Sequence, residues 1–484
     1  MKIIGFVLTL LVLAVAISQM TLQAAENIKP NVLFIAIDDL RTELGCYEKK
    51  HIRSPNIDRL ATQGILFEHA YCMVSVCGAS RSCLLSGIRP KYNRFVDAGA
   101  SVSTDTPNAI PLNTHFKNHG YTTINNGKVF HARTDHNDGW SEPAWRPSGS
   151  EYALPESLEA LEKDREYKTS IAKDKKKIVA IGPAWESADV PDNFYQDGKT
   201  LEKSLTDLRN LAKSDKPFFL AVGFLKPHPP FVAPKKYWNL YKKEDIKLPE
   251  NLRYVPKDCP AEAVHDYKGF KSRPGFPKND PIDDETAKTL IHAYYACVSY
   301  TDALVGSLLD ELEKSGIADN TIVVLWGDHG WHLGEHTQWS KHSVFENPMK
   351  APLIIRLPGQ KEAKRFSLPV EFIDIYPTLN ELAGLSEPQK NQLQGKSLVP
   401  LIEGKIVPKI LYAAGRYGTG DTIFDGRFRY SEFRDKKGGG KLVSRMLYDH
   451  HVDQRENVNI VDKPENKEVV ERLSSELHRT IALP

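Results

Sequence analysis

The 484-residue sequence contains six cysteines and no C-x-x-C pair. The absence of that spacing argues against a zinc ribbon or a thioredoxin-like redox centre. The six are Cys46, Cys72, Cys77, Cys83, Cys259 and Cys297. If the chain is exported, Cys72 and Cys83 could form a disulfide around Cys77. Cys259 and Cys297 are expected to be small buried hydrophobic residues.

The sequence also lacks an excess of charge of either sign. Its 64 Lys and Arg residues oppose 62 Asp and Glu residues, which gives a formal charge of +2. This balance is not that of a nucleic-acid-binding protein, so any polyanionic partner has to meet a local patch. A hydrophobic content of 41% is enough for a substantial core, and no internal repeat is visible.

Only one long apolar run is present, at residues 3–17, and it is too short to cross a bilayer. It follows Met1 and Lys2 and precedes small residues, a pattern typical of a secretory signal peptide over residues 1–25, cleaved near Ala24 or Ala25. The sequence therefore predicts a soluble, exported protein, periplasmic or secreted, with no membrane span.

Three apolar segments are typical of strands buried on both faces. Residues 32–37 precede two aspartates, and the same pattern recurs in residues 216–231 and 320–336. Residues 285–316 carry apolar side chains at helical spacing and end at Gly316, a suitable helix terminus. A long helix before a buried strand predicts an α/β fold with a large, mostly parallel central sheet flanked by helices. In such sheets ligands bind outside the carboxyl ends of the strands.

The remaining segments are less regular. Residues 140–200 contain Pro, Gly and Ser interruptions, and their charged run at 162–177 is expected to be a solvated helix or loop. A linker near 384–404 separates a predicted catalytic domain, 26–404, from a C-terminal subdomain, 405–484. In that subdomain residues 424–433 and 444–450 predict antiparallel strands, and residues 466–481 an amphipathic helix.

Two of the predicted strands end in residues that could bind a metal ion. Asp38 and Asp39 repel each other unless a cation lies between them, and a hard divalent cation such as calcium prefers oxygen ligands. An N-cap role for one aspartate is the alternative. The "GDHG" segment supplies Asp328 and His329. Imidazole suits softer metals, so His329 either ligates or hydrogen-bonds beside the ion.

Cationic and proton-carrying side chains are expected near the same strand ends. If a helix begins at Cys77, Arg81 lies on the same face, one turn further on. The other candidates are Lys128, His131, His228, His336, Lys341 and His342. Each is ordinary alone, but together with the carboxylates they predict a pocket for an oxyanion such as sulfate or phosphate.

The segment "CGASR" followed by "LLSG" resembles the signature of the type I, formylglycine-dependent sulfatases. The similarity extends over nearly the whole chain after residue 25, through "NVLFIAIDDLR", "GKVFH" and "GDHGWHLGEHTQW", and is closest to the iduronate-2-sulfatase-like branch. It implies an alkaline-phosphatase-like sulfatase fold. Many members of the family have proline where this chain has Ala79, so it is open which maturation enzyme recognises the segment.

The resemblance also implies a mechanism and a role for each candidate. The cysteine that matches Cys77 is oxidised to Cα-formylglycine, whose hydrate attacks sulfur with one hydroxyl and releases sulfate with the help of the other. The residues that match calcium ligands are Asp38, Asp39, Asp328, His329 and the converted Cys77. Arg81 and Lys128 match groups that hold the formylglycine and the sulfate, and His131 matches the base. His228 and Lys341 match groups that bind sulfate and help to protonate the leaving alcohol.

We therefore expect a sulfatase that acts on a sulfated oligosaccharide or polysaccharide, at a terminal 2-sulfated uronic acid or an algal sugar such as ulvan-type rhamnose sulfate. A formylglycine-generating enzyme would be a required partner. One alternative is a phosphoester or phosphonate-ester hydrolase of the same superfamily, although "VCGASR" lacks the Ser or Thr nucleophile of a zinc phosphatase. The other is a non-catalytic protein that binds sulfated glycans and keeps Cys77 unconverted.

Overall fold

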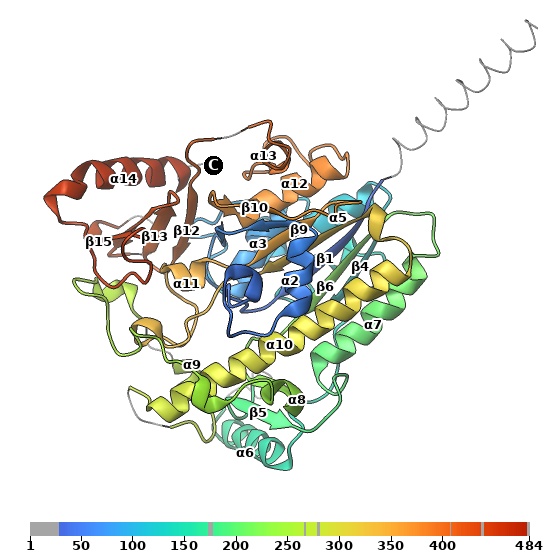
Figure 1. Cartoon of the computed structure of the whole chain (residues 1–484), viewed down its shortest axis with the longest axis horizontal. Coiled ribbons are helices and arrows are strands. Elements are labelled where there is room, and N and C mark those ends of the chain that lie inside the picture. Colours follow the sequence, from blue (N-terminus) through green and yellow to red (C-terminus); the bar gives the residue numbers. More distant parts are fainter. Residues whose placement is uncertain are drawn as a thin grey trace, which may run out of the picture.

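The computed structural model, drawn in Figure 1, describes residues 29–172, 178–265, 268–277, 281–406, 408–436 and 440–481. The predicted signal peptide lies outside the described residues. Among the described helices, none has both the length and the apolar character needed to cross a membrane.

A seven-stranded mixed sheet forms the centre of the molecule (Figure 1). Its order is β10 (Lys364–Phe366), β2 (Ile65–Phe67), β9 (Leu353–Arg356), β8 (Thr321–Gly327), β1 (Asn31–Ile37), β6 (Phe218–Phe224) and β4 (Thr122–Gly127). Strands β8, β1, β6 and β4 are parallel neighbours, and β10 is parallel to β2, whereas β9 is antiparallel to both β2 and β8. Every residue of β1, β6 and β8 is buried, as predicted for strands covered on both faces.

Helices cover both faces of the sheet. Alternate residues of β1 point to opposite sides, so that Ile35 packs in one hydrophobic cluster and Phe34 in another. The Ile35 side is covered by α2 (Pro55–Thr62), α7 (Gln196–Leu211) and α10 (Asp284–Lys314). The Phe34 side is covered by α3 (Cys77–Ser86), α5 (Leu112–Asn118) and α12 (Ile375–Leu382).

The long predicted helix is confirmed as α10. Its N-cap Asp283 accepts a hydrogen bond from the backbone N–H of Thr286 at 2.7 Å. The helix ends at Lys314, and Gly316 follows with φ of +71°, a conformation that glycine adopts without steric cost. The helix leads directly into β8, which places the end of that strand beside the end of β1.

Shorter elements complete this part of the chain. They are β3 (Ala70–Tyr71), α4 (Val102–Asp105), α6 (Pro155–Ile171), β5 (Trp185–Ala188), β7 (Phe231–Pro234), α8 (Lys235–Trp238), α9 (Lys268–Lys271), α11 (Glu346–Met349), β11 (Val370–Glu371) and α13 (Val399–Ile402). The charged run lies partly in α6, most of which is exposed or half-buried, as expected; residues 173–177 lie outside the described residues.

The expectation of a linker at residues 384–404 is wrong. Gln392 is buried and donates to the carbonyls of Ser86 and Ile110, and the segment also contains α13. Because its polar groups bond to the body of the protein, this stretch packs as part of the main fold.

A separate four-stranded antiparallel sheet follows in the C-terminal part. It contains β12 (Ala413–Tyr417), β13 (Gly420–Phe424), β14 (Phe428–Arg434) and β15 (Leu442–Asp449) in sequential order, and α14 (Lys467–Ile481) packs against it (Figure 1). The predicted strands and terminal helix are therefore present. The domain boundary between residues 404 and 405 stays a prediction.

Candidate active site

The ends of β1 and β8 fix the first two candidate segments. The backbone N–H of Asp38 donates to the carbonyl of Phe224, and that of Asp328 donates to the carbonyl of Ile37, each at 3.1 Å. These bonds continue the parallel ladder by one residue and hold both carboxylates at the same edge of the sheet. Asp39 then turns away with φ of +60°, and its N–H donates to Oδ1 of Asp328 at 3.0 Å.

Helix α3 brings the third segment to this edge. It begins at Cys77, so Arg81 lies one turn further along, as predicted. The guanidinium Nε of Arg81 donates to Oδ2 of Asp328 at 2.9 Å, and the hydroxyl of Ser80 donates to the backbone carbonyl of Asp328. Gly78 lies so close to the carbonyl of Ala98 that a Cβ would be 2.2 Å from it. The first turn of α3 is therefore tightly fixed against β8.

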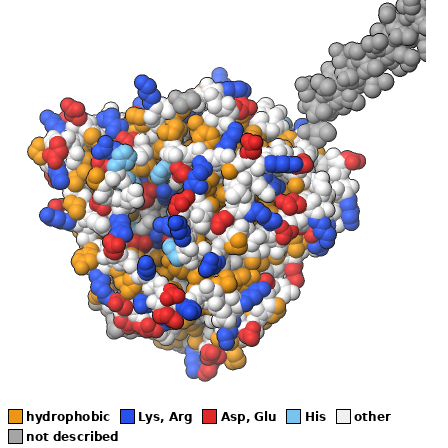
Figure 2. All heavy atoms as spheres, viewed as in Figure 1, with side chains coloured by type: hydrophobic (Ala, Val, Ile, Leu, Met, Phe, Trp, Pro, Cys, Tyr) orange, Lys and Arg blue, Asp and Glu red, His pale blue; other side chains and the backbone are white. Residues whose placement is uncertain are grey.

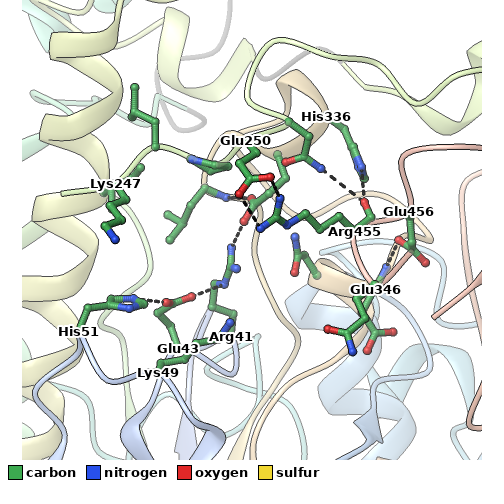
Figure 3. A pocket seen from close by; sticks show the side chains of 18 of the residues that line it. Arg41, Glu43, Lys49, His51, Lys247, Glu250, His336, Glu346, Arg455 and Glu456 are labelled. Atoms are coloured by element: carbon green, nitrogen blue, oxygen red, sulfur yellow. Dashed lines mark hydrogen bonds and ion pairs between the residues drawn. The ribbon is translucent and has the colours of Figure 1, made fainter. Parts of the chain in front are cut away.

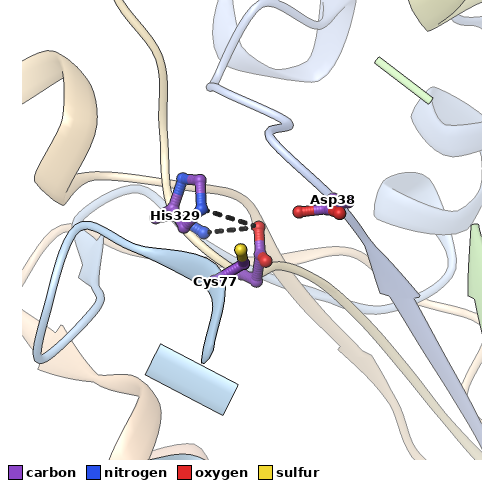
Figure 4. Close-up of side chains that lie close together, drawn as sticks. Asp38, Cys77 and His329 are labelled. Carbon is purple, nitrogen blue, oxygen red and sulfur yellow. Dashed lines mark hydrogen bonds and ion pairs between the residues drawn. The ribbon is translucent and has the colours of Figure 1, made fainter. Parts of the chain in front are cut away.

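Four potential metal ligands converge there (Figure 4). One ligand atom from each of Asp38, Cys77, Asp328 and His329 lies within 4.8 Å of the others, and all four residues are buried. No other such group is found in the part of the chain that the structure describes. Asp39 lies beside these four residues: its Oδ1 is 3.3 Å from Nε2 of His329 and accepts from Lys341, which leaves Oδ2 as the oxygen without a hydrogen-bond partner.

Two lysines neutralise part of this negative charge. Lys128 donates to Oδ2 of Asp38, and Lys341 donates to Oδ1 of Asp39 at 2.5 Å. The ammonium of Lys341 also lies 3.8 Å from Sγ of Cys77. One oxygen of each of these aspartates remains buried without a hydrogen-bond partner, as does Nε2 of His329. Unpartnered buried acceptors of this kind are costly, and a bound cation would satisfy them.

Burial and charge shift the acidities of these groups. Burial opposes ionisation of Asp38, but Lys128 and other nearby cations hold the pKa of its carboxyl well below the usual range. For Asp39 burial dominates over the attraction of Lys341 and raises its pKa to about 7. Burial alone would raise the pKa of the Cys77 thiol, yet Lys341 and Lys128 bring it well below its ordinary value. The site therefore favours an anionic sulfur at residue 77.

The loop after β4 carries two more candidates, and two arginines hold it. Nη1 of Arg81 donates to the carbonyls of Lys128 and Val129. Nη2 of Arg146 donates to those of Phe130 and His131. Four consecutive carbonyls are thereby fixed. Lys128 points to Asp38, and the imidazole of His131 contacts the Cys77 thiol, whose pKa it helps to lower.

His228 follows β6 and is also held by its neighbours. The carboxylate of Asp197 accepts from the N–H groups of Leu225 and Lys226, and the ammonium of Lys226 donates to the carbonyls of His228 and Pro230. Burial and then the neighbouring lysines keep the pKa of His228 well below 6.5, although Asp38 acts in the opposite direction. The imidazole is therefore neutral at pH 7.

The structure separates two histidines that the sequence placed near Lys341. His342 stays close, and its ring lies 5.2 Å from that of Tyr417 in β12. Burial and Lys341 lower its pKa to about 3. His336 instead lies in a different cavity, where Nε2 contacts the carbonyl of Arg455 at 2.8 Å.

That second cavity has a volume of about 490 Å³ and does not include Cys77 (Figure 3). Acids and bases alternate around it and pair with one another: Arg41 contacts Glu335 at 2.8 Å and Glu43 at 3.0 Å. Arg455 pairs with Glu250. The face shown in Figure 2 is similarly mixed, with basic and acidic side chains interspersed. The pairing leaves none of these five side chains as a free charge for a ligand.

The possible disulfide between Cys72 and Cys83 is not present, and all six cysteines are free thiols. Cys72 packs in the hydrophobic cluster beside the central sheet, whereas Cys83 packs in a separate cluster on the other side of α3. Neither thiol is bonded to Cys77.

Sequence reasoning missed Ser80 and Arg146, which donate to backbone carbonyls of candidate residues, and Asp197, which holds the segment before His228. Ser80 lies within the recognised motif, so its position carried a signal. Asp197 and Arg146 come from the irregular region 140–200, and no pattern in the sequence links them to the strand ends.

The fold and the site together place buried carboxylates, a cysteine, a histidine and two lysines at the carboxyl edge of an α/β sheet, an arrangement that is typical of an enzyme. Comparison with known proteins makes the class specific. The family model described as sulfatase matches residues 30–385, and a model described as N-sulphoglucosamine sulphohydrolase, C-terminal, matches residues 334–482. The chain therefore belongs to the sulfatase family, and it is a sulfuric ester hydrolase.

Two curated relatives are similar over most of the chain. It is 34% identical to iduronate 2-sulfatase of Homo sapiens over 397 residues, which cover 80% of this chain and 69% of that protein. It is 33% identical to a sulfatase of Formosa agariphila over 465 residues, 94% of this chain and 87% of that protein.

Two solved structures share the fold. One, determined in complex with its substrate D-glucosamine-2-N,6-O-disulfate, has a TM-score of 0.72 and 22% identity and covers 93% of this chain and 97% of its own. The other, a phosphonate monoester hydrolase of Agrobacterium radiobacter, has a TM-score of 0.72 and 24% identity and covers 94% and 96%.

Proposed function

We propose that this protein is an exported carbohydrate sulfatase that depends on formylglycine at residue 77 and on a bound calcium ion. The observation that carries the proposal is the convergence of Cys77 with Asp38, Asp328 and His329 within 4.8 Å at the ends of two parallel strands. A residue 77 that lies among carboxylates and lysines is well placed for a reaction at a charged ester.

The donor set fits a hard divalent cation. Oδ1 of Asp38 and Oδ2 of Asp39 are buried and unpartnered, and carboxylate oxygens are the preferred ligands of calcium. Asp328 and the imidazole of His329 would complete the protein's contribution. A cation held there would lower the pKa of a hydroxyl on the matured residue 77.

The side chains around residue 77 have complementary roles in this proposal. Formylglycine supplies a hydrated aldehyde, with one hydroxyl for attack on sulfur and one for release of sulfate. Arg81 fixes the first turn of α3 and the Lys128 loop. Lys128 and Lys341 offset the charge of the sulfate group. His131 contacts residue 77 and accepts the proton that is lost on release. His228 and Lys341 bind the sulfate and assist the departing alcohol.

The substrate class is supported by the relatives. Iduronate 2-sulfatase and the solved complex with a glucosamine disulfate both concern sulfated sugars. We propose a terminal 2-sulfated uronic acid, or an algal sugar such as ulvan-type rhamnose sulfate, as the group that this enzyme desulfates. The catalytic part would be residues 26–404, followed by the subdomain 405–484. A signal peptide over residues 1–25 would direct export, and a formylglycine-generating enzyme would act on the segment around Cys77.

The test is sulfate release from defined sulfated oligosaccharides by protein produced together with a formylglycine-generating enzyme. We expect release from chain ends, with loss of activity in a Cys77→Ala variant prepared in the same way. Release only from mid-chain positions would contradict terminal action, and equal release by the variant would contradict the role of residue 77.

Hydrolysis of phosphoesters or phosphonate esters is the second candidate, because the phosphonate monoester hydrolase shares the fold. Sulfate and phosphoryl groups have similar shapes, so matched aryl sulfate and aryl phosphonate monoesters separate the two activities. We expect the larger kcat/KM for the sulfate. A larger value for the phosphonate ester would favour the alternative.

A further inference from the structure

A pair of arginines without acidic partners lies beside the Lys128–His131 loop. Arg146 donates only through Nη2, to the carbonyls of Phe130 and His131. Nη2 of Arg133 donates to the carbonyl of Arg146 at 3.0 Å. Within the described ranges neither guanidinium has a carboxylate at ion-pair distance.

The backbone explains why Arg146 lies at this place. Trp145 forms a parallel bridge with Asn126 near the end of β4; its N–H donates to the carbonyl of Asn125 at 3.0 Å, and its carbonyl accepts from Gly127 at 2.8 Å. Residue 146 is thereby fixed next to the turn at Gly127 that leads into the loop. The position is determined by strand-like pairing, so the guanidinium is preorganised.

The electrostatics of Arg146 are those of a cation that lacks a counterion. It is half-buried, and burial, followed by repulsion from Arg81 and Arg133, lowers its pKa to about 10, with only Asp38 acting in the opposite direction. The effects of Arg81 and Asp38 also indicate that Arg146 lies near the Cys77 group. Its Nε and Nη1 make no hydrogen bond and are not among the fully buried, unpartnered atoms. They are free to bind an anion.

We propose that Arg146, assisted by Arg133, forms a second anion subsite that binds a carboxylate or a second sulfate on the sugar whose sulfate ester is cleaved. The inference rests on the proposed carbohydrate sulfatase function and narrows its substrate to sugars that carry two anionic groups. A guanidinium binds either oxyanion through paired N–H donors, so the subsite chemistry is the same for both sources.

Isothermal titration calorimetry with Cys77→Ala protein tests the subsite without turnover. Three probes differ only in their second anion: the 2-sulfates of 4-nitrophenyl glucoside and 4-nitrophenyl glucuronide, and the 2,6-disulfate of the glucoside. We expect one or both two-anion probes to bind about tenfold more tightly than the monosulfate. Preference for the glucuronide identifies a carboxylate, preference for the disulfate identifies a second sulfate, and preference for both identifies a shared site.

The same titrations in an Arg146→Gln background should abolish the preference, so that the two-anion probes bind no more tightly than the monosulfate. Arg479→Gln, on the exposed face of α14, is the matched control and should keep the preference. Because Arg146 also holds the loop, Arg133→Gln provides a second variant in which the bonds to Phe130 and His131 remain. It should reduce the preference partially.

Three results would overturn the subsite. The first is equal affinity for all three probes, and the second is no binding of any of them. The third is an equal loss of affinity for all three probes in Arg146→Gln. The last result would assign Arg146 to loop structure alone. Sulfate release by matured protein is measured separately, so a failure of the sulfatase function is distinguishable from a failure of the subsite.

Discussion

Two polar regions of this molecule are both rich in acids and bases, but they are built differently. In the cavity around Arg41, each of the five lining glutamates has its buried oxygens partnered, and the unpartnered buried atoms, Asn251 Oδ1 and His336 Nδ1, are not carboxylate oxygens. At the Cys77 group, Asp38 and Asp39 each keep one buried oxygen without a partner. Paired carboxylates stabilise a fold or remain neutral to it, whereas buried carboxylate oxygens without a hydrogen-bond partner favour the binding of a cation. The Arg41 cavity is therefore the less informative of the two regions for function.

The largest effect should come from replacing the sulfur that maturation requires. We expect Cys77→Ser, prepared with the maturation enzyme, to lose about 10⁵-fold in kcat. A serine has no second hydroxyl for release of bound sulfate, so at most one turnover is expected. The measurement is sulfate release over time, with circular dichroism as the control for folding. Sustained turnover by the variant would contradict the need for formylglycine.

The second prediction concerns the buried carboxylate oxygens that have no hydrogen-bond partner. Asp38→Asn should lower kcat/KM by about 10³-fold. Calcium that binds only to the folded state stabilises the protein. The variant should therefore also lose the stabilisation that added calcium gives to chelator-treated wild type. The measurements are sulfate release and the shift in Tm when calcium is added. Glu43→Gln, in the cavity around Arg41, is the control. An unchanged calcium shift in Asp38→Asn would place the ion elsewhere.

The Arg41 cavity should respond in the opposite way, with a loss of stability and little change in activity. Glu43→Gln removes a carboxylate that contacts Arg41 and His51, so we expect it to lower the free energy of unfolding by roughly 3 kcal/mol at neutral pH. Activity at a temperature well below unfolding should change less than about twofold. Urea unfolding and sulfate release measure the two quantities. A large loss of activity without a loss of stability would make the Arg41 cavity part of the active site.

The smallest effect is the pH dependence of the difference in unfolding free energy between wild type and Glu43→Gln. Burial opposes ionisation of Glu43, but Arg41 and His51 lower its pKa from 4.5 to about 2. The ionised carboxylate therefore stabilises the folded state fully above about pH 4.5, and this contribution is lost as the pH falls through about 2. The difference between wild type and Glu43→Gln should shrink over that interval. A difference that does not depend on pH would show that packing, not charge, is responsible.

The sequence predicted the strand ends well because their signal is local. Residues 32–37 are uniformly apolar and are followed at once by carboxylates, and parallel strands bring their carboxyl ends to one edge. The same logic does not separate His336 from Lys341: His336 lines the Arg41 cavity, whereas Lys341 lies against Asp39. Arg146 could not be predicted, since its position depends on pairing between Trp145 and the end of β4.

The most direct test of the central claim is mass spectrometry of the peptide that contains Cys77, performed on preparations of graded specific activity. We predict a peptide whose mass reflects loss of H₂S and gain of one oxygen, in a fraction that rises in proportion to sulfate release. A fully active preparation in which residue 77 carries only an intact thiol would contradict the account.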